Sequence, residues 1–347
     1  MAQGGGFTGE GRRQARAGAL KAAWWGLAGL AARRLVRRRE GESPISPATS
    51  EPAPRGFARA QWLEAFEKDR RDVEQGLYPA MDDMLANPAE AVRAAIDMLT
   101  DAREVDARRR RLGGGEARDD APEGGAYPAY YRQNFHFQSG GWFTAASARR
   151  YEAQVETLFA GAAGAMRRRA LSLLARAWRA RDQRQLMVAD IACGSGGFLR
   201  DLARTFPRAG LIGVDLSAAY AREAAERSGV ATIQAKAERL PFADASLDAA
   251  ACVYLFHELP AAVRKAVAVE IARVLKPGGL LAFADSVQPS EEPRLARLLE
   301  VFPAYFHEPY FADYGRTDLT AVFAEAGFVE RGRDRAFLTS AMLLEKR

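Results

Sequence analysis

The stretch from Val188 to Leu199, which reads V-A-D-I-A-C-G-S-G-G-F-L, constrains the fold more than any other part of the chain. A short apolar run containing an acid leads into glycines and then into apolar residues at helical spacing. This order is typical of a buried strand, a tight turn and the start of a helix. Glycine suits the turn because a side chain there would keep a ligand away from the backbone. The pattern predicts the first βα unit of an α/β sheet that binds a nucleotide-like ligand.

The residues around this loop separate two kinds of ligand. A dinucleotide-binding loop has a third glycine three residues after the second, and Leu199 stands at that position. Asp190, just before the loop, would repel a pyrophosphate but favours a cationic group. A second apolar run ends at Asp215, 21 residues after Gly194, where a carboxylate at the tip of the second strand meets a ribose diol. These positions predict a ligand with a ribose and a cationic end.

Three later segments occur in a recognisable order. They are Glu238–Phe242 followed by Ser246–Asp248, Leu255–Pro260, and Val274–Gly279. Together with the two strand ends, these segments resemble the class I S-adenosylmethionine-dependent methyltransferases, in particular the small-molecule and quinone-type branch. The resemblance covers residues 161–347. It implies a doubly wound, mostly parallel seven-stranded sheet, S-adenosylmethionine as cofactor, and methyl transfer as the reaction.

The periodicity of this region agrees with such a sheet, because strands alternate with helices of 10–15 residues. The expected helices are Ala145–Phe159, Ala162–Ala180, Gly197–Thr205, Ala218–Ser228, Ala261–Leu275 and Leu319–Ala326. After the strand before the glycine loop, the expected strands are Leu211–Asp215, Ala231–Gln234, Ala249–Val253 and Leu280–Asp285, then two near Arg335 and Ala341, the last of them antiparallel.

By the same resemblance, nine residues contact the cofactor: Asp190, Ala192, Gly194, Gly196, Asp215, Leu216, Ala237, Glu238 and Tyr254. Gly194 and Gly196 let the backbone approach the amino-acid part, Asp215 accepts hydrogen bonds from the ribose, and Leu216 packs on the adenine. One position departs from the pattern, because many relatives have Asp where this chain has Lys236. We therefore expect the adenine amino group to pair with backbone or with Glu238.

A general base assists methyl transfer when the acceptor is a hydroxyl or a carbon acid. The chain has three histidines, and His257, just past the fourth strand, is the first candidate, with Tyr254 beside it. His307 is the next candidate. Each of them equally fits a hydrogen-bonded packing role. No metal site is predicted, since neither Cys193 nor Cys252 has metal-ligand spacing, and both are expected to be small buried residues of a reducing compartment.

The net charge of +6 is unevenly distributed. Residues 1–39 hold nine bases and one acid, and the rest of the chain holds 41 bases and 43 acids. The body is therefore close to neutral, and we expect no nucleic-acid partner.

The first 56 residues predict a basic tail followed by a Ser/Pro-rich linker. The uncharged run Ala22–Ala32, with Trp24 and Trp25, is too short for a bilayer span, which takes about 20 residues. Three interpretations stay open: a disordered or loosely helical tail, a membrane-surface helix within residues 12–39, and an organellar transit peptide. A secretory segment is disfavoured, so the expected location is the cytoplasm or an organelle interior.

Residues 57–160 predict a helical extension, with a helix starting at Asn87–Pro88 and a mobile loop at Gly113–Gly125. Its last part, Tyr127–Gly141, is dense in aromatic and hydrogen-bonding groups. Five of these side chains fit either a lid over a small-molecule pocket or a structural plug: Tyr130, Tyr131, Asn134, His136 and Gln138.

The sequence thus predicts an S-adenosylmethionine-dependent methyltransferase acting on a small aromatic or lipophilic acceptor. Two alternatives remain: a non-catalytic cofactor-binding scaffold or assembly factor, and an RNA methyltransferase.

Overall fold

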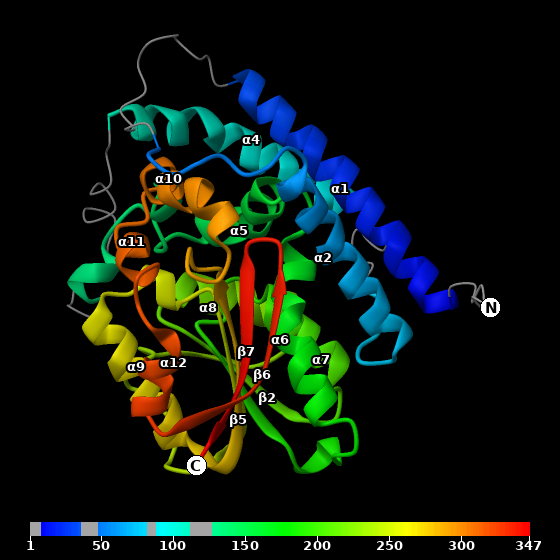
Figure 1. Ribbon diagram of the computed structural model, residues 1–347, viewed down its shortest axis with the longest axis vertical. Coiled ribbons are helices and arrows are strands. Elements are labelled where there is room, and N and C mark those ends of the chain that lie inside the picture. The colour runs from blue at the N-terminus through cyan, green and yellow to red at the C-terminus, as the bar shows by residue number, and fades with distance from the viewer. Residues whose placement is uncertain (1–7, 36–47, 82–87, 112–126) are drawn as a thin grey trace.

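The computed structural model describes residues 8–35, 48–81, 88–111 and 127–347 (Figure 1). Its centre is a seven-stranded sheet in the order β3-β2-β1-β4-β5-β7-β6. The strands are β1 (Met187–Ile191), β2 (Gly210–Asp215), β3 (Thr232–Gln234), β4 (Leu247–Val253), β5 (Leu275–Ser286), β6 (Phe328–Ala336) and β7 (Thr339–Lys346). The first five are mutually parallel, and β7 runs antiparallel between β5 and β6. This confirms the predicted doubly wound, mostly parallel sheet.

Helices bury both faces of the sheet. Helices α6 (Ala163–Ala177) and α7 (Gly197–Thr205) pack on one face, and α9 (Ala261–Val274) and α12 (Leu319–Glu325) pack on the other (Figure 1). Helix α8 (Ala218–Ser228) lies beside α7 along β2 and β3. In β1, Val188 joins the core under α6, whereas Ala189 and Ile191 join the core under α9. Burial on both faces explains why these strands read as continuous apolar runs.

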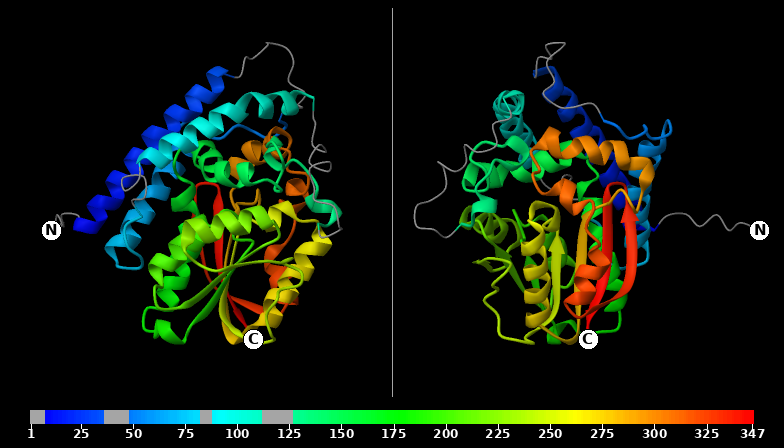
Figure 2. Two further views of the ribbon diagram at one scale, coloured as in Figure 1. Left: turned by 180° about the vertical axis from the view of Figure 1, so that it is seen from behind. Right: turned by 60° about the vertical axis from the view of Figure 1, so that its left-hand side comes forward.

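The remaining helices form a cap over the carboxyl ends of the parallel strands (Figures 1 and 2). The cap consists of α1 (Gly9–Leu35), α2 (Phe57–Glu74), α4 (Pro88–Arg110), α5 (Ala145–Leu158), α10 (Ala296–Phe306) and α11 (Phe311–Tyr314). Two short 3-10 turns, η2 (Ala129–Tyr131) and η3 (Phe135–Phe137), lie beneath these helices, and η5 (Phe256–Glu258) follows β4. The cap places side chains over the sheet edge where ligands of such folds bind.

Helix α1 differs from the disordered or loosely helical tail that the sequence allowed. It is 27 residues long and packs on α2, α4 and α5. Small residues permit this contact, since a Cβ at Gly18 would lie 2.9 Å from the Phe66 ring. A Cβ at Gly161 would lie 2.6 Å from the backbone of Lys21. Trp25 is buried in a small cluster with α4 and α5, so part of the apolar run serves internal packing.

Buried charges join the cap to the sheet. Arg168, on α6, donates to both carboxylate oxygens of Asp69 on α2 at 2.7 Å and to Asp201 on α7 at 3.0 Å. Its neighbour Arg169 pairs with Asp72 at 2.8 Å. All of these side chains are at least nine-tenths buried. The helical extension and the methyltransferase region, predicted as separate units, therefore share one packed interior, because α2 and α6 also contribute to the same apolar core.

Most predicted elements lie within a few residues of their observed bounds. Helices α10 and α11 were not predicted, because the aromatic stretch Phe302–Phe311 has no clear helical period and Pro303 lies inside α10. The predicted helix start at Asn87 and the loop Gly113–Gly125 lie outside the described residues, although α4 does begin at Pro88.

Candidate active site

A cavity of about 1020 Å³ opens at the carboxyl ends of β1, β2 and β4, under the cap. Eight of the nine residues predicted to contact the cofactor line it: Asp190, Ala192, Gly194, Asp215, Leu216, Ala237, Glu238 and Tyr254. The ninth, Gly196, lies in the loop itself as the residue before α7.

The glycine loop has the backbone geometry that its sequence suggests. Gly194 and Gly196 have positive φ angles of 56° and 84°, which cost glycine little. A Cβ at Gly196 would lie 2.7 Å from the Cα of Ala224, so only glycine fits between α7 and α8. A Cβ at Gly194 would meet only the ring of Tyr151, at 4.0 Å, and would enter the cavity. One glycine is thus needed for packing and the other for access to the backbone.

Asp215 is buried and held by backbone donors. Its carboxylate accepts hydrogen bonds from Gly194 N–H at 2.9 Å and from Ser217 N–H at 2.8 Å. Burial nevertheless raises its pKa to about 6. Each oxygen keeps further lone pairs for ribose hydroxyls, so the acid expected at the tip of β2 is oriented as a ribose ligand requires.

Asp190 has fewer hydrogen-bond donors around its carboxylate than Asp215 has. The side chain is buried, and its Oδ2 has no hydrogen-bond partner among the described residues. Burial, with a smaller contribution from Asp215, raises the pKa of Asp190 well above its usual value. An unpaired acid beside an open glycine loop fits a ligand with a cationic end, as the methionine part of S-adenosylmethionine has.

Glu238 is occupied by a residue of the cap. Tyr130 donates its hydroxyl proton to Glu238 Oε1 at 2.6 Å. Burial, together with this bond, raises the pKa of Tyr130. This bond ties η2 to the expected adenine end of the cavity. Lys236 forms an isolated β-bridge with Arg239, so its backbone shapes the same turn.

Sequence reasoning missed the ion pair that supports the glycine loop. Arg167 donates two hydrogen bonds to Glu152, at 2.9 and 2.7 Å, and Ser195 Oγ donates to the same carboxylate at 3.0 Å. Burial would raise the pKa of Glu152, but Arg167 lowers it strongly. The two residues come from α6 and α5, and their sequence neighbourhoods read as ordinary helix. No local motif marks them.

A second cavity of about 590 Å³ lies next to the first. Tyr151 and Tyr254 line both cavities. Most of its other walls are apolar, and they come from α5, α10, α11 and the β6–β7 turn: Val155, Leu158, Phe159, Leu298, Leu299, Phe302, Phe311 and Leu338. The polar groups at its walls include His136, His257 and Ser286. Tyr254, which lines both cavities, has a φ of 59°, a strained conformation for a non-glycine residue.

His257 is held by an acid at the end of β5. Its Nδ1 lies 2.6 Å from Asp285 Oδ1, and Asp285 is fully buried. Asp285 Oδ2 also accepts from the backbone N–H of Phe256 at 2.8 Å. Burial alone would lower the pKa of His257, but the Asp285 carboxylate outweighs it and raises the pKa to about 10. The imidazole is therefore fixed in orientation at the wall of the second cavity.

The structure does not bring the other candidate base, His307, to either cavity. Its Nε2 lies 3.1 Å from Gln133 Oε1, and its ring packs against Phe137. His136, which the sequence placed only in the aromatic segment, lines the second cavity instead. Burial lowers the pKa of His136 to about 3, so this imidazole is neutral.

The aromatic segment has features of both a lid and a plug. Tyr130 and Tyr131 line the first cavity. Asn134 and Gln138 are buried and bond to backbone carbonyls of their own turn, at 2.9 and 3.0 Å. The aromatic rings thus face the ligand space while the amides hold the segment's shape.

The fold, the glycine loop and the two strand-end acids define a class I S-adenosylmethionine-dependent methyltransferase. Residues 188–279 match the family model of a methyltransferase domain. These residues are therefore a methyltransferase domain of the class I type, for which S-adenosylmethionine is the cofactor.

Several curated relatives align with part of the chain. A ubiquinone/menaquinone biosynthesis C-methyltransferase from Syntrophotalea carbinolica is 34% identical over 139 residues, which are 37% of this chain and 57% of that protein. A fatty-acid O-methyltransferase from Mycolicibacterium smegmatis is 34% identical over 119 residues, or 33% of this chain and 43% of that one. The chain thus spans little more than half the length of the first relative.

Among solved structures, a geranyl diphosphate methyltransferase in complex with its substrate and sinefungin has a TM-score of 0.44 and 15% identity. The match covers 55% of this chain and 81% of that one.

Proposed function

We propose that this protein transfers a methyl group from S-adenosylmethionine to a small, lipophilic acceptor bound in the second cavity. The observation that carries the proposal is that the two cavities are neighbours and share Tyr151 and Tyr254 as lining residues. The cofactor cavity has several carboxylates among its lining residues, whereas the lining of the second cavity is mostly apolar and, among the described residues, includes no carboxylate. A flat or elongated apolar molecule suits the second cavity, because apolar walls with few polar groups are typical of small-molecule sites.

The cofactor supplies an activated methyl group. An atom of the acceptor forms the new bond to the methyl carbon while the carbon–sulfur bond breaks, sulfur keeps that electron pair, and the acceptor loses a proton. The protein's part is to align the two molecules and exclude water. Asp285 holds His257 Nδ1, so that Nε2 of the ring is the atom available to hydrogen-bond an acceptor.

The named relatives support a lipophilic acceptor. Their names include methyltransferases of quinone biosynthesis, of fatty acids and of phthiotriol dimycocerosates. These are different products that share long apolar parts, so they favour a class of acceptor without selecting one.

The first test is binding of S-adenosylmethionine by titration calorimetry, followed by transfer of labelled methyl to a lipid extract, to total RNA and to protein. We expect label in the lipid extract. Label in RNA would instead favour the RNA-methyltransferase alternative. Cofactor binding without transfer to any of the three would favour a scaffold or assembly factor.

His257→Gln tests the proposed orientation of the acceptor. Because Asp285 holds the pKa of His257 at about 10, the ring is protonated near neutral pH and donates a hydrogen bond to the acceptor instead of acting as a general base. Losing one hydrogen bond that involves a charged group should lower turnover about 10- to 100-fold, with little change in cofactor affinity. Ser286→Ala, a second polar wall residue of the same cavity, is the matched control and is expected to change turnover much less. Equal activity of His257→Gln and the parent protein would remove His257 from the mechanism.

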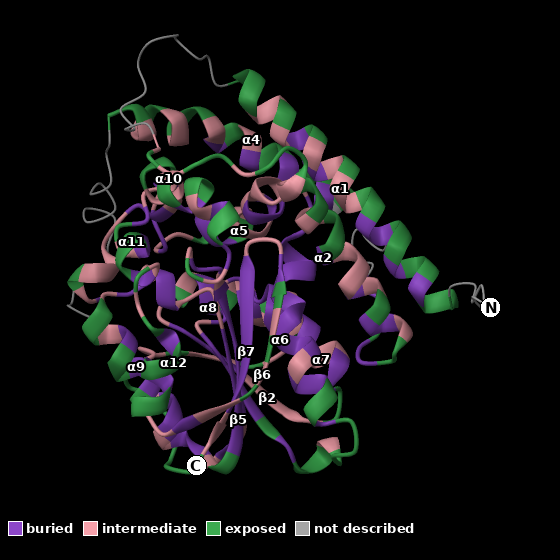
Figure 3. Cartoon of the chain, in the orientation of Figure 1, coloured by how far each residue is buried: buried purple, intermediate pink, exposed green. Residues whose placement is uncertain are grey.

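We also propose that the outer face of α1 holds the protein against an anionic membrane. Figure 3 shows exposed residues recurring along α1. The exposed leucines Leu20, Leu27 and Leu30 are seven and three residues apart, which places them on one stripe of the helix. Exposed bases flank the stripe, with Arg16 before it and Arg33–Arg34 after it. Apolar side chains between bases match the surface of an anionic bilayer. In the described part of the chain, no helix has the length and apolarity to cross one.

Vesicle sedimentation tests this surface. We expect binding to vesicles containing phosphatidylglycerol, weaker binding to phosphatidylcholine alone, and loss of binding in Leu27→Glu/Leu30→Glu. Val269→Glu, at an equally exposed apolar residue on α9, is the control, because α9 lies on the far side of the molecule from α1 (Figure 1). Equal binding by both variants, or none by the parent protein, would refute the membrane proposal.

A further inference from the structure

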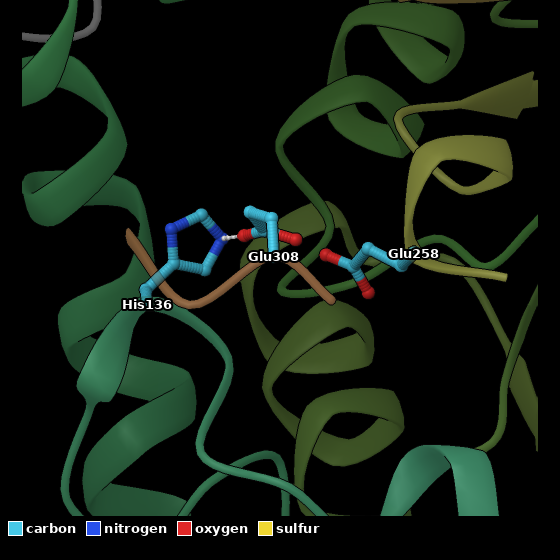
Figure 4. Close-up of side chains that lie close together, drawn as sticks. All are labelled: His136, Glu258 and Glu308. Atoms are coloured by element: carbon cyan, nitrogen blue, oxygen red, sulfur yellow. Dashed lines mark ion pairs between the residues drawn. The ribbon is translucent and has the colours of Figure 1, made fainter. Parts of the chain in front are cut away.

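Three side chains that the proposed mechanism does not use meet beside the two cavities: His136, Glu258 and Glu308 (Figure 4). One possible ligand atom from each lies within 4.8 Å of the other two. They come from η3, from η5 and from the turn after α10. Figure 4 shows the Glu308 carboxylate between the His136 ring and the Glu258 carboxylate. The fold thus brings three distant segments together at one point.

Glu308 is the least accessible of the three. Its side chain is completely buried, and neither carboxylate oxygen has a hydrogen-bond partner among the described residues. His136 Nε2 lies 3.3 Å from its Oε1. A buried carboxylate without donors, next to a second carboxylate, is costly unless a positive charge lies between them. The protonated His257 lies 4.0 Å from Glu258 Oε1 and offsets part of this charge, but no donor in the described part of the chain reaches the oxygens of Glu308, which are therefore open to a cation.

We propose that His136, Glu258 and Glu308 bind a divalent metal cation. An imidazole nitrogen with two carboxylates is a ligand set suited to Mn²⁺ or Zn²⁺. The cation would neutralise both carboxylates. Three protein ligands also leave coordination positions open to another molecule, as catalytic metal sites do.

The position of the cluster suggests what would occupy those open positions, an inference that rests on the proposed function. Glu258 lines the cofactor cavity and His136 lines the second cavity. A cation between them faces the place where methyl group and acceptor meet. A hydroxyl oxygen of the acceptor bound there loses its proton to water more readily. That oxygen then forms the bond to the methyl carbon as the carbon–sulfur bond breaks and sulfur keeps the electron pair. The cluster thus favours an oxygen acceptor.

Metal binding is testable without any acceptor. The full-length protein, stripped with a chelator, is titrated with MnCl₂ while free Mn²⁺ is followed by electron paramagnetic resonance, and ZnCl₂ is then added as a competitor. We expect one Mn²⁺ per chain, displaced by Zn²⁺. Glu308→Gln and His136→Ala should each weaken binding at least tenfold. Glu156→Gln is the matched control, because Glu156 is another buried carboxylate with an unpartnered oxygen, on α5 and outside the cluster.

The outcomes separate the metal site from the proposed function. No Mn²⁺ bound by the folded parent protein, or equal binding by Glu308→Gln, overturns the site. If a protonated amine of the acceptor occupied the cluster instead of a metal ion, Mn²⁺ would likewise not bind, so this result also counts against the metal site. Metal binding without methylation of any extract keeps the site and overturns the function. Should Glu308→Gln lose its near-ultraviolet circular dichroism, Glu258→Gln, whose side chain is 15% exposed, replaces it.

Discussion

The two cavities differ in how their walls are built. The cofactor cavity is formed largely by residues at the ends of four neighbouring strands and in the loops that directly follow them, with a smaller set of residues from the helices and turns above. The second cavity draws its walls from α5, α10, α11, η3 and the β6–β7 turn, which are far apart in the chain. The first arrangement is common to a superfamily and the second belongs to this chain's cap. Cofactor identity is therefore carried by the sheet, and acceptor identity by the helices over it.

The largest effect is expected from a substitution that weakens the contact between the cap and the sheet. Asp69→Ala removes the carboxylate that Arg168 grips at 2.7 Å and leaves a buried guanidinium with less compensation. We expect a loss of about 3–5 kcal/mol in the free energy of unfolding, typical of breaking a buried ion pair from one side. Denaturant titration measures it. Asp182→Ala, at a surface ion pair with Arg184, should cause little change.

The form of the Asp69→Ala transition is also informative. The shared core predicts a single cooperative transition, at lower denaturant concentration. Two separate transitions would show that cap and sheet fold independently. Arg168 and its neighbours also hold the pKa of Asp69 at about 2 against the burial that would raise it. Its stabilising contribution is therefore fully present above about pH 4 and is lost as the pH falls through about 2.

The second prediction concerns the sheet side alone. Asp215→Ala removes the acceptor of two backbone hydrogen bonds and of the expected ribose contacts. Hydrogen bonds to a charged group contribute about 1.5–3 kcal/mol each, so losing one ribose contact should lower cofactor affinity by roughly 10-fold to 150-fold. Titration calorimetry measures the loss. Unchanged affinity in a folded variant would mean that the cofactor does not lie along β2.

The third prediction concerns the cap side alone. Leu298→Trp adds bulk at a partly exposed wall of the second cavity. We expect the KM for a long apolar acceptor to rise about tenfold, because a mismatch of one methylene group in an apolar pocket commonly has an effect of this size. The dissociation constant of S-adenosylmethionine should stay the same. A change in cofactor affinity equal to the change in KM would mean that the cavities do not bind separate molecules.

The sequence predicted the sheet and its cofactor cavity better than the cap and the second cavity. The strands, and the residues that line the first cavity at their ends, could be predicted from short motifs, because a glycine loop and strand-end acids depend on local geometry. Glu152 and Arg167 were missed because their pairing depends on how α5 packs against α6. Helix α1 was read as a tail because its small residues look unstructured until the surface they pack against is known. Likewise, the apolar run Leu280–Ala284 revealed a strand, whereas the walls of the second cavity had no motif.

The last prediction concerns how the affinity for S-adenosylmethionine depends on pH through Asp215. Burial raises the pKa of Asp215 to about 6, well above the model-peptide value of 3.8. Without cofactor, the folded protein therefore holds the proton of Asp215 more tightly than the unfolded chain does. The contribution of this proton to the free energy of unfolding is full below about pH 4 and is lost as the pH rises through about 6. Ribose hydroxyls donate to the ionised form, so binding must remove that proton. We expect cofactor affinity to be about fourfold lower at pH 5.5 than at pH 7, measured by calorimetry in buffers of different ionisation enthalpy. Asp215→Asn should flatten this dependence, and a slope that persists in Asp215→Asn would assign it to Asp190, the neighbouring buried acid.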